Sequence, residues 1–136
     1  MKHKAVLAFY IRLSQEDFFK ASGEIDESAS ISHQRDLLQY TYSSRPDLSG
    51  YEVVEFVDDG YSGTNFNRPS FRKMMEEVKR GNIQCIMVKD FSRFARNFRD
   101  AGEYLEQIFP FLGVRFISVN DHYDSDTKEG TAGTGM

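Results

Sequence analysis

The sequence predicts an α/β domain built around a mainly parallel β-sheet. Short apolar runs alternate with longer segments in which apolar residues recur at helical spacing, a pattern typical of parallel strands joined by helices. The chain has 136 residues, 40% of them hydrophobic and 28% charged. This size and composition suit one globular domain with a substantial core.

Four apolar runs are the expected strands. They span Ala5 to Ile11, Glu52 to Val57, Gln84 to Val88, and Val114 to Val119. The one cysteine, Cys85, lies within the third run, where we expect a buried, unreactive thiol. A single cysteine cannot form an intramolecular disulfide, so the reducing cytoplasm is the expected location.

Two helices are expected between the first three strands. Ser30 can cap the first helix, and Pro46 stops it. Pro69 occupies the first position of the second helix, and Gly81 ends it in the left-handed conformation. The residues expected to face the core are Ile31, Leu37, Leu38 and Tyr42 in the first helix, and Phe71, Met74, Met75 and Val78 in the second.

A third helix is expected before the fourth strand, closed by Pro110 and Gly113. Its apolar stripe consists of Phe98, Ala101, Leu105 and Ile108. Its water-facing residues are Arg99, Asp100, Glu103 and Glu106. This division into two faces is typical of a helix that packs on one side.

Composition and charge limit the function classes. No apolar run approaches the ~20 residues of a membrane span, and we expect neither a membrane segment nor a signal peptide. The net charge is −4, with 21 acidic against 17 basic residues, which is unfavourable for nonspecific binding to DNA phosphates. A DNA enzyme of this charge either concentrates its basic residues in one site or has its main DNA-binding part elsewhere. The glycine-rich residues 127–136, typical of a shortened linker, favour the second option.

Polar side chains of related chemistry follow three of the expected strands. Arg12 and Ser14 leave the first strand on the same side. Residues 58–64 form a turn with two glycines after the second strand, and Arg93 and Arg96 follow the third. Because ligands of open α/β sheets bind at the carboxyl ends of the strands, we expect these residues to meet. The two downstream arginines share a face if their segment is helical.

A serine among arginines predicts phosphoryl transfer. Arg68 precedes the proline-started helix, whose amide-rich end is a site for anions, and it adds a fourth guanidinium group to the set. Guanidinium groups carry fixed charge and forked donors that match phosphate oxygens, so they can stabilise a phosphorane without metal. Removing one such donor typically costs ~3 kcal/mol of transition-state stabilisation.

Other readings of these residues stay open. Ser14 can cap a turn, Ser62 can serve its turn only, and Gln34 can be an ordinary exposed helix residue. A solvated, ion-paired face is the alternative for Arg93, Arg96, Arg99, Asp100 and Glu103. The nearest candidate metal site, Asp121 to Asp126, is interpreted as a hydrated loop. The scattered histidines His3, His33 and His122 form no Ser-His-Asp pattern.

Five segments, in order, resemble the catalytic domain of the serine recombinases, most closely that of the large serine recombinases and transposases of mobile elements. They are Tyr10 to Ser14, Ser30 to Gln34, Asp59 to Thr64 with Asn67 to Pro69, Val88 to Asn97, and Gly113 to Ser118. The resemblance implies a resolvase-like three-layer domain, with a mainly parallel central sheet of four or five strands flanked by helices.

The resemblance also implies a role for each candidate residue. Ser14 is the nucleophile that forms a phosphoserine bond to a DNA 5′ end and frees a 3′ hydroxyl. Arg12, Arg68, Arg93 and Arg96 match the active-site arginines of the family, and Gln34, Asp59 and Ser62 match supporting positions near the phosphate. One departure is Ser92, where the family often has an aspartate; Asp90 lies nearby but out of register. Neither a metal nor a cofactor is implied.

The implied partners are those of a recombinase. Residues 1–123 would form the catalytic domain, and residues 124–136 a glycine-rich linker towards a long helix and a DNA-binding region. The substrate would be double-stranded DNA at specific recombination sites, cut and rejoined by a dimer or tetramer of the full-length enzyme during integration, excision or transposition. The alternatives are a catalytically idle recombinase-like interaction module and a flavodoxin-like domain that binds phosphoesters.

Overall fold

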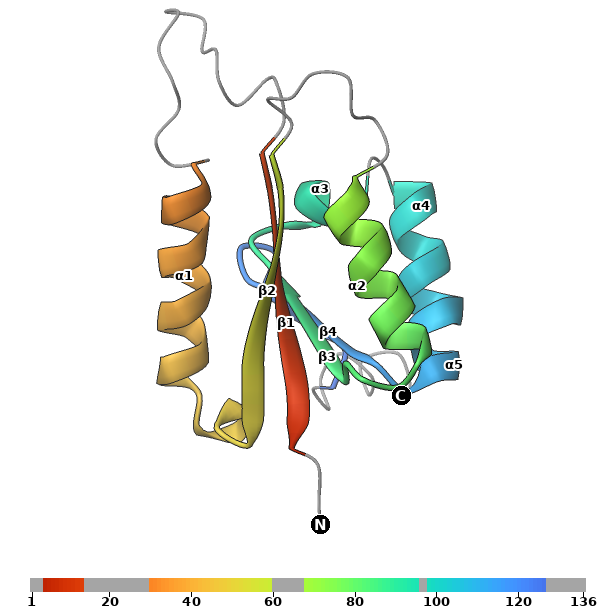
Figure 1. Cartoon of the computed structure of the whole chain (residues 1–136), viewed down its shortest axis with the longest axis horizontal. Helices are drawn as coiled ribbons and strands as arrows, with labels where there is room; N and C mark the ends of the chain where they lie inside the picture. The colour runs from red at the N-terminus through yellow and green to blue at the C-terminus, as the bar shows by residue number, and fades with distance from the viewer. Residues whose placement is uncertain (1–3, 14–29, 60–67, 96–97, 127–136) are drawn as a thin grey trace, which may run out of the picture.

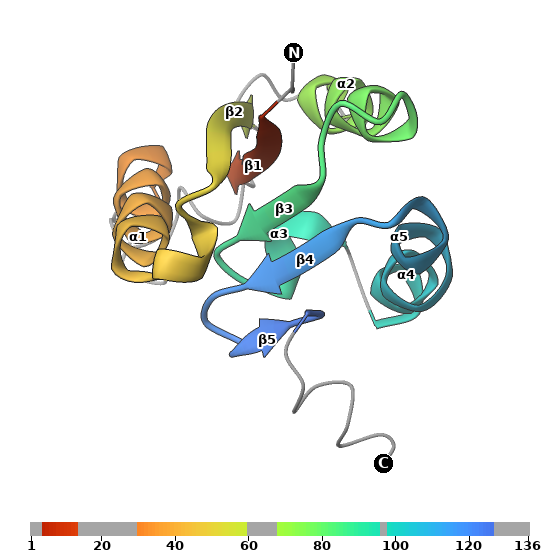
Figure 2. The same cartoon turned by 90° about the horizontal axis from the view of Figure 1, so that it is seen from below.

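The structure, a computed structural model, describes residues 4–13, 30–59, 68–95 and 98–126. Within these ranges the centre is a five-stranded sheet in the order β2-β1-β3-β4-β5 (Figure 1, Figure 2). The strands are β1 (Ala5–Leu13), β2 (Tyr51–Asp59), β3 (Cys85–Val88), β4 (Arg115–Ser118) and β5 (Tyr123–Asp124). The first four are parallel and β5 runs antiparallel to β4, which confirms the expected mainly parallel sheet.

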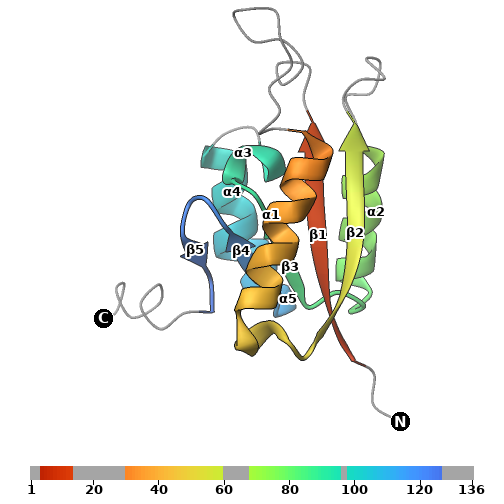
Figure 3. The ribbon, with the colours of Figure 1, turned by 90° about the vertical axis from the view of Figure 1, so that its left-hand side faces the viewer.

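Helices cover both faces of the sheet and complete the three expected layers (Figure 1). One face carries α1 (Ile31–Ser44) and the 3-10 turn η3 (Pro46–Leu48), and the other carries α2 (Pro69–Lys79), α4 (Phe98–Glu103), the π-helical turn η5 (Tyr104–Ile108) and α5 (Phe109–Leu112). The short helix α3 (Phe91–Phe94) follows β3 near the carboxyl end of the sheet (Figure 3). None of the helices in the described ranges is long and apolar enough to span a bilayer.

The central strand β1 supplies both cores of the domain. Leu7, Phe9 and Ile11 face α1, and Ala8 and Tyr10 face α2 and the α4–α5 run. All five side chains have 0% exposed surface. A strand covered on both faces needs apolar residues at successive positions, which is why β1 appears in the sequence as a continuous apolar run.

Cys85 lies in the core on the α1 face, as expected. Burial raises the pKa of its thiol to about 12. The thiol therefore stays protonated near neutral pH, and Cys85 acts as an apolar packing residue.

The first two helices begin and end as their sequences predict. Ser30 Oγ accepts a hydrogen bond from the His33 amide at 3.1 Å, and α1 ends before Pro46. Pro69 begins α2, and Gly81 follows its end with φ of +83°. The expected core residues of α2, Phe71, Met74, Met75 and Val78, are all buried; in α1, Leu38 is buried, whereas Ile31, Leu37 and Tyr42 are partly exposed.

The third helix differs from the prediction at Pro110. The chain stays helical through this residue and ends only at Gly113, where φ is +72°. In an α-helix a proline ring clashes with the carbonyl four residues earlier, here that of Glu106. The π-helical turn before Pro110, in which the Phe109 amide donates to the Tyr104 carbonyl, displaces that carbonyl. Pro110 is thereby accommodated within the helical run.

The wider turn also changes which side chains reach the core. Ala101 is buried as expected, but Leu105 and Ile108 are only half-buried, and Phe109, outside the expected stripe, is 1% exposed. The side chain of Phe98 lies outside the described part of the chain. The four residues expected to face water, Arg99, Asp100, Glu103 and Glu106, are exposed.

Asp124 corrects the interpretation of residues 121–126 as a hydrated loop. It is the second residue of β5, is only 8% exposed, and is therefore part of the sheet rather than of a linker beginning at residue 124. Its carboxylate accepts hydrogen bonds from Arg115 Nη2 and Arg45 Nη2, both at 2.8 Å. Burial alone would raise the pKa of Asp124, but these two guanidinium groups and the Asp126 amide lower it to about 2.

We predict that the Asp124 carboxylate makes the fold sensitive to acid. A pKa of about 2 in the folded state, against ~3.9 in the unfolded chain, adds stability above pH ~4 that is lost as the pH falls towards 2. The difference in unfolding free energy between wild type and Asp124→Asn should therefore shrink by about 2 kcal/mol from pH 6 to pH 2. Urea unfolding across this range measures it. Asp126→Asn, at a more exposed carboxylate, is the control, and parallel curves for wild type and Asp124→Asn would contradict the prediction.

Candidate active site

The candidate site lies where β1 extends beyond β3. The two strands pair only from Leu7 to Phe9 on β1, which then continues to Leu13. β2 and β3 flank β1 on opposite sides, and α1 and α2 cover opposite faces of the sheet. In open α/β sheets such a reversal of strand order, at the carboxyl ends of the strands, marks the place where ligands bind. The helix α3 lies at this position.

Arg12 and Arg93 hold each other in place by reciprocal hydrogen bonds between the end of β1 and α3. Arg12 Nε donates to the Arg93 carbonyl, and Arg93 Nη1 donates to the Arg12 carbonyl, both at 3.1 Å. Arg12 Nη2 also donates to the Ser92 carbonyl. The acceptors are uncharged backbone carbonyls, so these contacts fix the orientation of the two guanidinium groups.

The helix α3 is capped by Asp90. Its carboxylate accepts a hydrogen bond from the Ser92 amide at 3.0 Å and lies 3.9 Å from Arg93 Nε. Asp90 thus approaches Arg93 from the N-cap position of α3, three residues earlier in the chain. It is not in register with the aspartate that the family often has at the position of Ser92. Ala95 has extended backbone, so the helix ends at Phe94; the expectation that Arg93 and Arg96 share a helical face concerns Arg96, which lies outside the described residues.

Arg68, at the start of α2, also contacts α3. Its Nη1 donates to the Phe94 carbonyl at 2.7 Å, and its guanidinium carbon lies 4.0 Å from the centre of the Phe71 ring. The backbone of Arg68 is left-handed, with φ of +48°, which is unusual for a residue with a Cβ atom. The surrounding contacts hold this residue, at the start of α2, in a strained conformation.

Gln34 and Asp59 occupy different environments. Gln34 is fully buried on α1, and its Nε2 donates to the Arg12 carbonyl at 2.9 Å, so α1 joins the arginine pair. Asp59 is the exposed last residue of β2, paired in register with Leu13. Ser14, Ser62 and Arg96 lie outside the described residues.

Asp58 is a structurally central residue that the sequence reasoning missed. Its carboxylate accepts hydrogen bonds from the Tyr10 hydroxyl at 2.6 Å and from the Ser70 and Phe71 amides at 2.9 Å. The carboxylate thus caps α2 where Arg68, the residue at the N-cap position, gives no side-chain cap. The alternation of side chains along a strand could have separated Asp58 from Asp59, because successive residues point to opposite faces of the sheet. Asp58 points into the core, and Asp59 is exposed to solvent.

Tyr10 is the hydrogen-bond donor to Asp58. Burial, and then the hydrogen bond to Asp58, raise the pKa of its phenol well above the ordinary value. Tyr10 therefore stays protonated near neutral pH and is unsuited to act as a general base. Among the described residues, no group of three or more His, Cys, Asp or Glu side chains could hold a metal ion.

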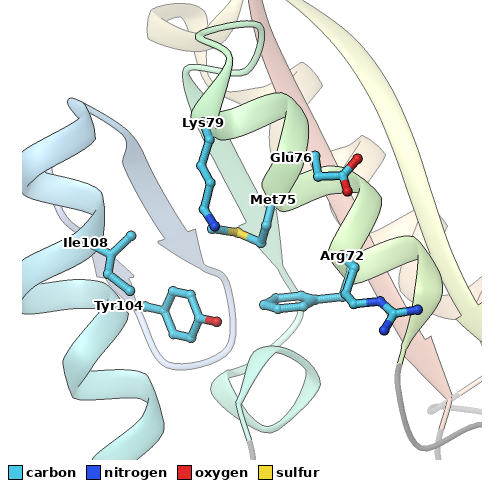
Figure 4. A pocket seen from close by; sticks show the side chains of 7 residues that line it. Arg72, Met75, Glu76, Lys79, Tyr104 and Ile108 are labelled. Atoms are coloured by element: carbon cyan, nitrogen blue, oxygen red, sulfur yellow. The ribbon is translucent and has the colours of Figure 1, made fainter.

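A pocket of about 300 Å³ lies between α2 and the π-helical turn (Figure 4). Met75 and Lys79 of α2 face Tyr104 and Ile108 across it, and Phe71 contributes an aromatic wall. This pocket is lined only by residues of α2 and η5, and neither Arg12 nor Arg93 contributes to it. It is not the phosphate pocket at the strand ends that a flavodoxin-like ligand-binding domain requires.

Comparison with known families identifies the domain. Residues 7–136 match the model of the resolvase family described as "Resolvase, N terminal domain". The chain belongs to this resolvase family. Its resemblance to the serine recombinases is therefore confirmed.

Relatives of this resolvase-family domain support the assignment. A resolvase family site-specific recombinase from Streptococcus pneumoniae is 30% identical, with a TM-score of 0.71 over 96% of this chain and 83% of that one. The N-terminal catalytic domain of TP901-1 integrase shares the fold, at 23% identity and a TM-score of 0.69 over 92% of this chain and 85% of that one. The Transposon Tn917 resolvase of Enterococcus faecalis is 25% identical over 83 residues, which are 61% of this chain and 44% of that protein. The match thus spans less than half the length of that curated relative.

We predict that Asp58 is needed to hold the resolvase-family site together. Asp58→Ala leaves the Tyr10 hydroxyl and two helix amides without their acceptor and should lower the unfolding free energy by about 3 kcal/mol. Asp58→Asn, which keeps one acceptor oxygen, should lose less. Chemical denaturation measures both, with Glu52→Gln, at an exposed position of the same strand, as the control, expected within about 0.5 kcal/mol of wild type. Equal stability of the Asp58→Ala and Glu52→Gln variants would contradict the prediction.

Proposed function

We propose that this chain is the catalytic domain of a serine site-specific recombinase that cuts and rejoins DNA through Ser14. The observation that carries the proposal is that Arg12 and Arg68 both donate to carbonyls of α3, while Arg93, which belongs to α3, donates to the Arg12 carbonyl on β1. These arginines come from three separate segments and meet at the carboxyl ends of the strands, beside the end of β1. Ser14, the next residue in the sequence, lies outside the described residues. Membership of the resolvase family supports the same reaction class.

The proposed chemistry is a transesterification. Ser14 Oγ loses its proton and attacks the phosphorus of a DNA phosphodiester. The bond from phosphorus to the 3′ oxygen breaks as the bond to Oγ forms, and the departing 3′ oxygen takes up a proton. The 5′ phosphate stays on the serine until a 3′ hydroxyl attacks it in the reverse reaction. The bond energy is retained in the phosphoserine, so neither a nucleotide cofactor nor a metal is proposed.

The arginines would stabilise the charge that develops on the phosphate oxygens. Fixed guanidinium groups act best when they are oriented before the reaction, because no reorganisation is then needed in the transition state. Arg12 and Arg93 are oriented by their carbonyl contacts, and Arg68 by the Phe71 ring and the Phe94 carbonyl. We place Arg96 in the same set, with Gln34, Asp59 and Ser62 in supporting positions near the phosphate.

The proposed substrate is double-stranded DNA at specific recombination sites, and the proposed assembly is a dimer or tetramer of the full-length enzyme. The net charge of −4 supports the proposal that most of the affinity for DNA comes from another region of the enzyme. In this proposal the part after Asp126 is a linker towards that region. Integration, excision and transposition of mobile elements are the processes that such an enzyme serves.

The two alternatives differ in how well they fit. A flavodoxin-like binder of small phosphoesters is disfavoured by the resolvase family match. A recombinase-like module without chemistry would have the same fold. The arginine contacts favour catalysis over this alternative, because a pure interaction module has no need of guanidinium groups oriented at the strand ends.

We predict a covalent protein–DNA adduct that depends on Ser14. The full-length protein is incubated with DNA from the ends of its element and quenched with detergent, and adducts on 5′ ends are quantified. Ser14→Ala should give none, because the nucleophile is absent. An adduct that persists in Ser14→Ala would exclude this serine as the nucleophile, and its absence from the wild type on a proven site would favour the idle module.

We further predict that Arg68→Ala slows adduct formation by about 100-fold, since one oriented donor contributes ~3 kcal/mol to the transition state. Arg80→Ala is the matched control, because Arg80 lies at the far end of the same helix and is exposed. Its rate should stay within about 2-fold of wild type. Single-turnover rates at saturating DNA make the comparison, and a wild-type rate for Arg68→Ala would remove Arg68 from the site.

A further inference from the structure

The turn between β4 and β5 holds the start of α3. The Val119 amide donates to the Val88 carbonyl at 3.0 Å, and the Asn120 amide donates to the Lys89 carbonyl at 2.8 Å. These backbone bonds continue the pairing of β4 with β3 past the end of both strands. The connection between β4 and β5 therefore lies against the segment that leads into α3 (Figure 3).

Asp121 in this turn makes the contact that reaches α3 itself. Its Oδ2 accepts hydrogen bonds from the Phe91 amide at 2.8 Å and from the Ser118 hydroxyl at 2.6 Å. Ser118 is fully buried, so its hydroxyl binds the Asp121 carboxylate from the core side. The next residue, His122, has φ of +54°, a left-handed conformation that turns the chain back into β5 directly after Asp121.

The helix α3 depends on such outside support. It has only four residues, and a helix of one turn is not stable by its own hydrogen bonds. Its Phe91 amide is held by Asp121 and its Ser92 amide by Asp90, so two carboxylates from different segments satisfy successive donors. The orientation of α3 is thus fixed from its N-terminal side by both.

The carbonyls of the same helix receive the active-site arginines. Arg12 donates to the Ser92 and Arg93 carbonyls, one and two residues after the amide held by Asp121. A displacement of α3 would move both acceptors and the Arg93 side chain together. We propose that Asp121 is a positioning residue, which sets Arg12 and Arg93 through α3; this inference rests on the proposed function for its catalytic consequence.

The positioning can be measured without DNA. In 15N-labelled protein, the Nε–H signal of Arg12 reports its hydrogen bond to the Arg93 carbonyl. Asp121→Ala should shift this signal or broaden it by exchange. Asp121→Asn retains an acceptor oxygen for the Phe91 amide and should restore it. Asn120→Ala is the matched control in the same turn, since its contact to Lys89 is made by the backbone and survives the substitution.

The catalytic consequence is measured with the full-length protein by single-turnover adduct formation at saturating DNA. Asp121→Ala should slow the reaction by about 10- to 100-fold, with unchanged DNA affinity, because a displacement of about 1 Å can cost a factor of 100 in rate. Asp121→Asn and Asn120→Ala should stay within about 3-fold of wild type. Melting temperatures measured in parallel separate this effect from general destabilisation.

The outcomes separate the two proposals. An altered Arg12 signal and a slow reaction in Asp121→Ala, both rescued by Asp121→Asn, support the positioning role. An unchanged Arg12 signal, or a wild-type rate in Asp121→Ala, overturns it. If the wild-type protein itself forms no adduct, the proposed function fails, and the Arg12 signal alone then decides whether Asp121 positions the arginines.

Discussion

β1 pairs with β2 along its whole length but with β3 only as far as Phe9, and the candidate site depends on this difference. Beyond Phe9 the side of β1 that faced β3 needs other hydrogen-bond partners, because unpaired backbone groups in the interior are costly. At Arg12 these partners are side chains: the Arg12 carbonyl accepts from Arg93 Nη1 and from Gln34 Nε2. The end of a β-ladder is thereby converted into a cluster of oriented polar groups, linked to the sheet on one side and to α1 and α3 on the other.

The features that the sequence predicted are those fixed by local chemistry. The Ser30 cap, the Pro69 start and the Gly81 end need no knowledge of the rest of the chain, and all three are found in the structure. The apolar runs also identified the buried strands, since a central strand such as β1 requires apolar residues on both faces. The arginines at the strand ends were predicted to meet because parallel strands bring their carboxyl ends to one edge.

What the sequence could not predict depends on contacts between distant residues. Asp58 and Asp59 are chemically identical neighbours; strand alternation places them on opposite faces, but the acceptor role of Asp58 depends on Tyr10 and on the start of α2, which only the folded chain brings to it. Asp124 is an acid in a polar segment until Arg45 and Arg115 are placed beside it. Pro110 is an ordinary helix terminator until a π-helical turn precedes it, and such a turn has no simple sequence pattern.

The distance along the chain between the parts of the site has a consequence for biosynthesis. Arg12 and the carbonyl that accepts its Nε–H are 81 residues apart, so this contact cannot form by local folding. A nascent chain that carries Ser14 and the first arginine has no oriented partner until β3 and α3 have been made and have docked. A DNA-cutting activity would be a hazard in an incomplete enzyme, and this topology withholds the assembled arginines from every such intermediate.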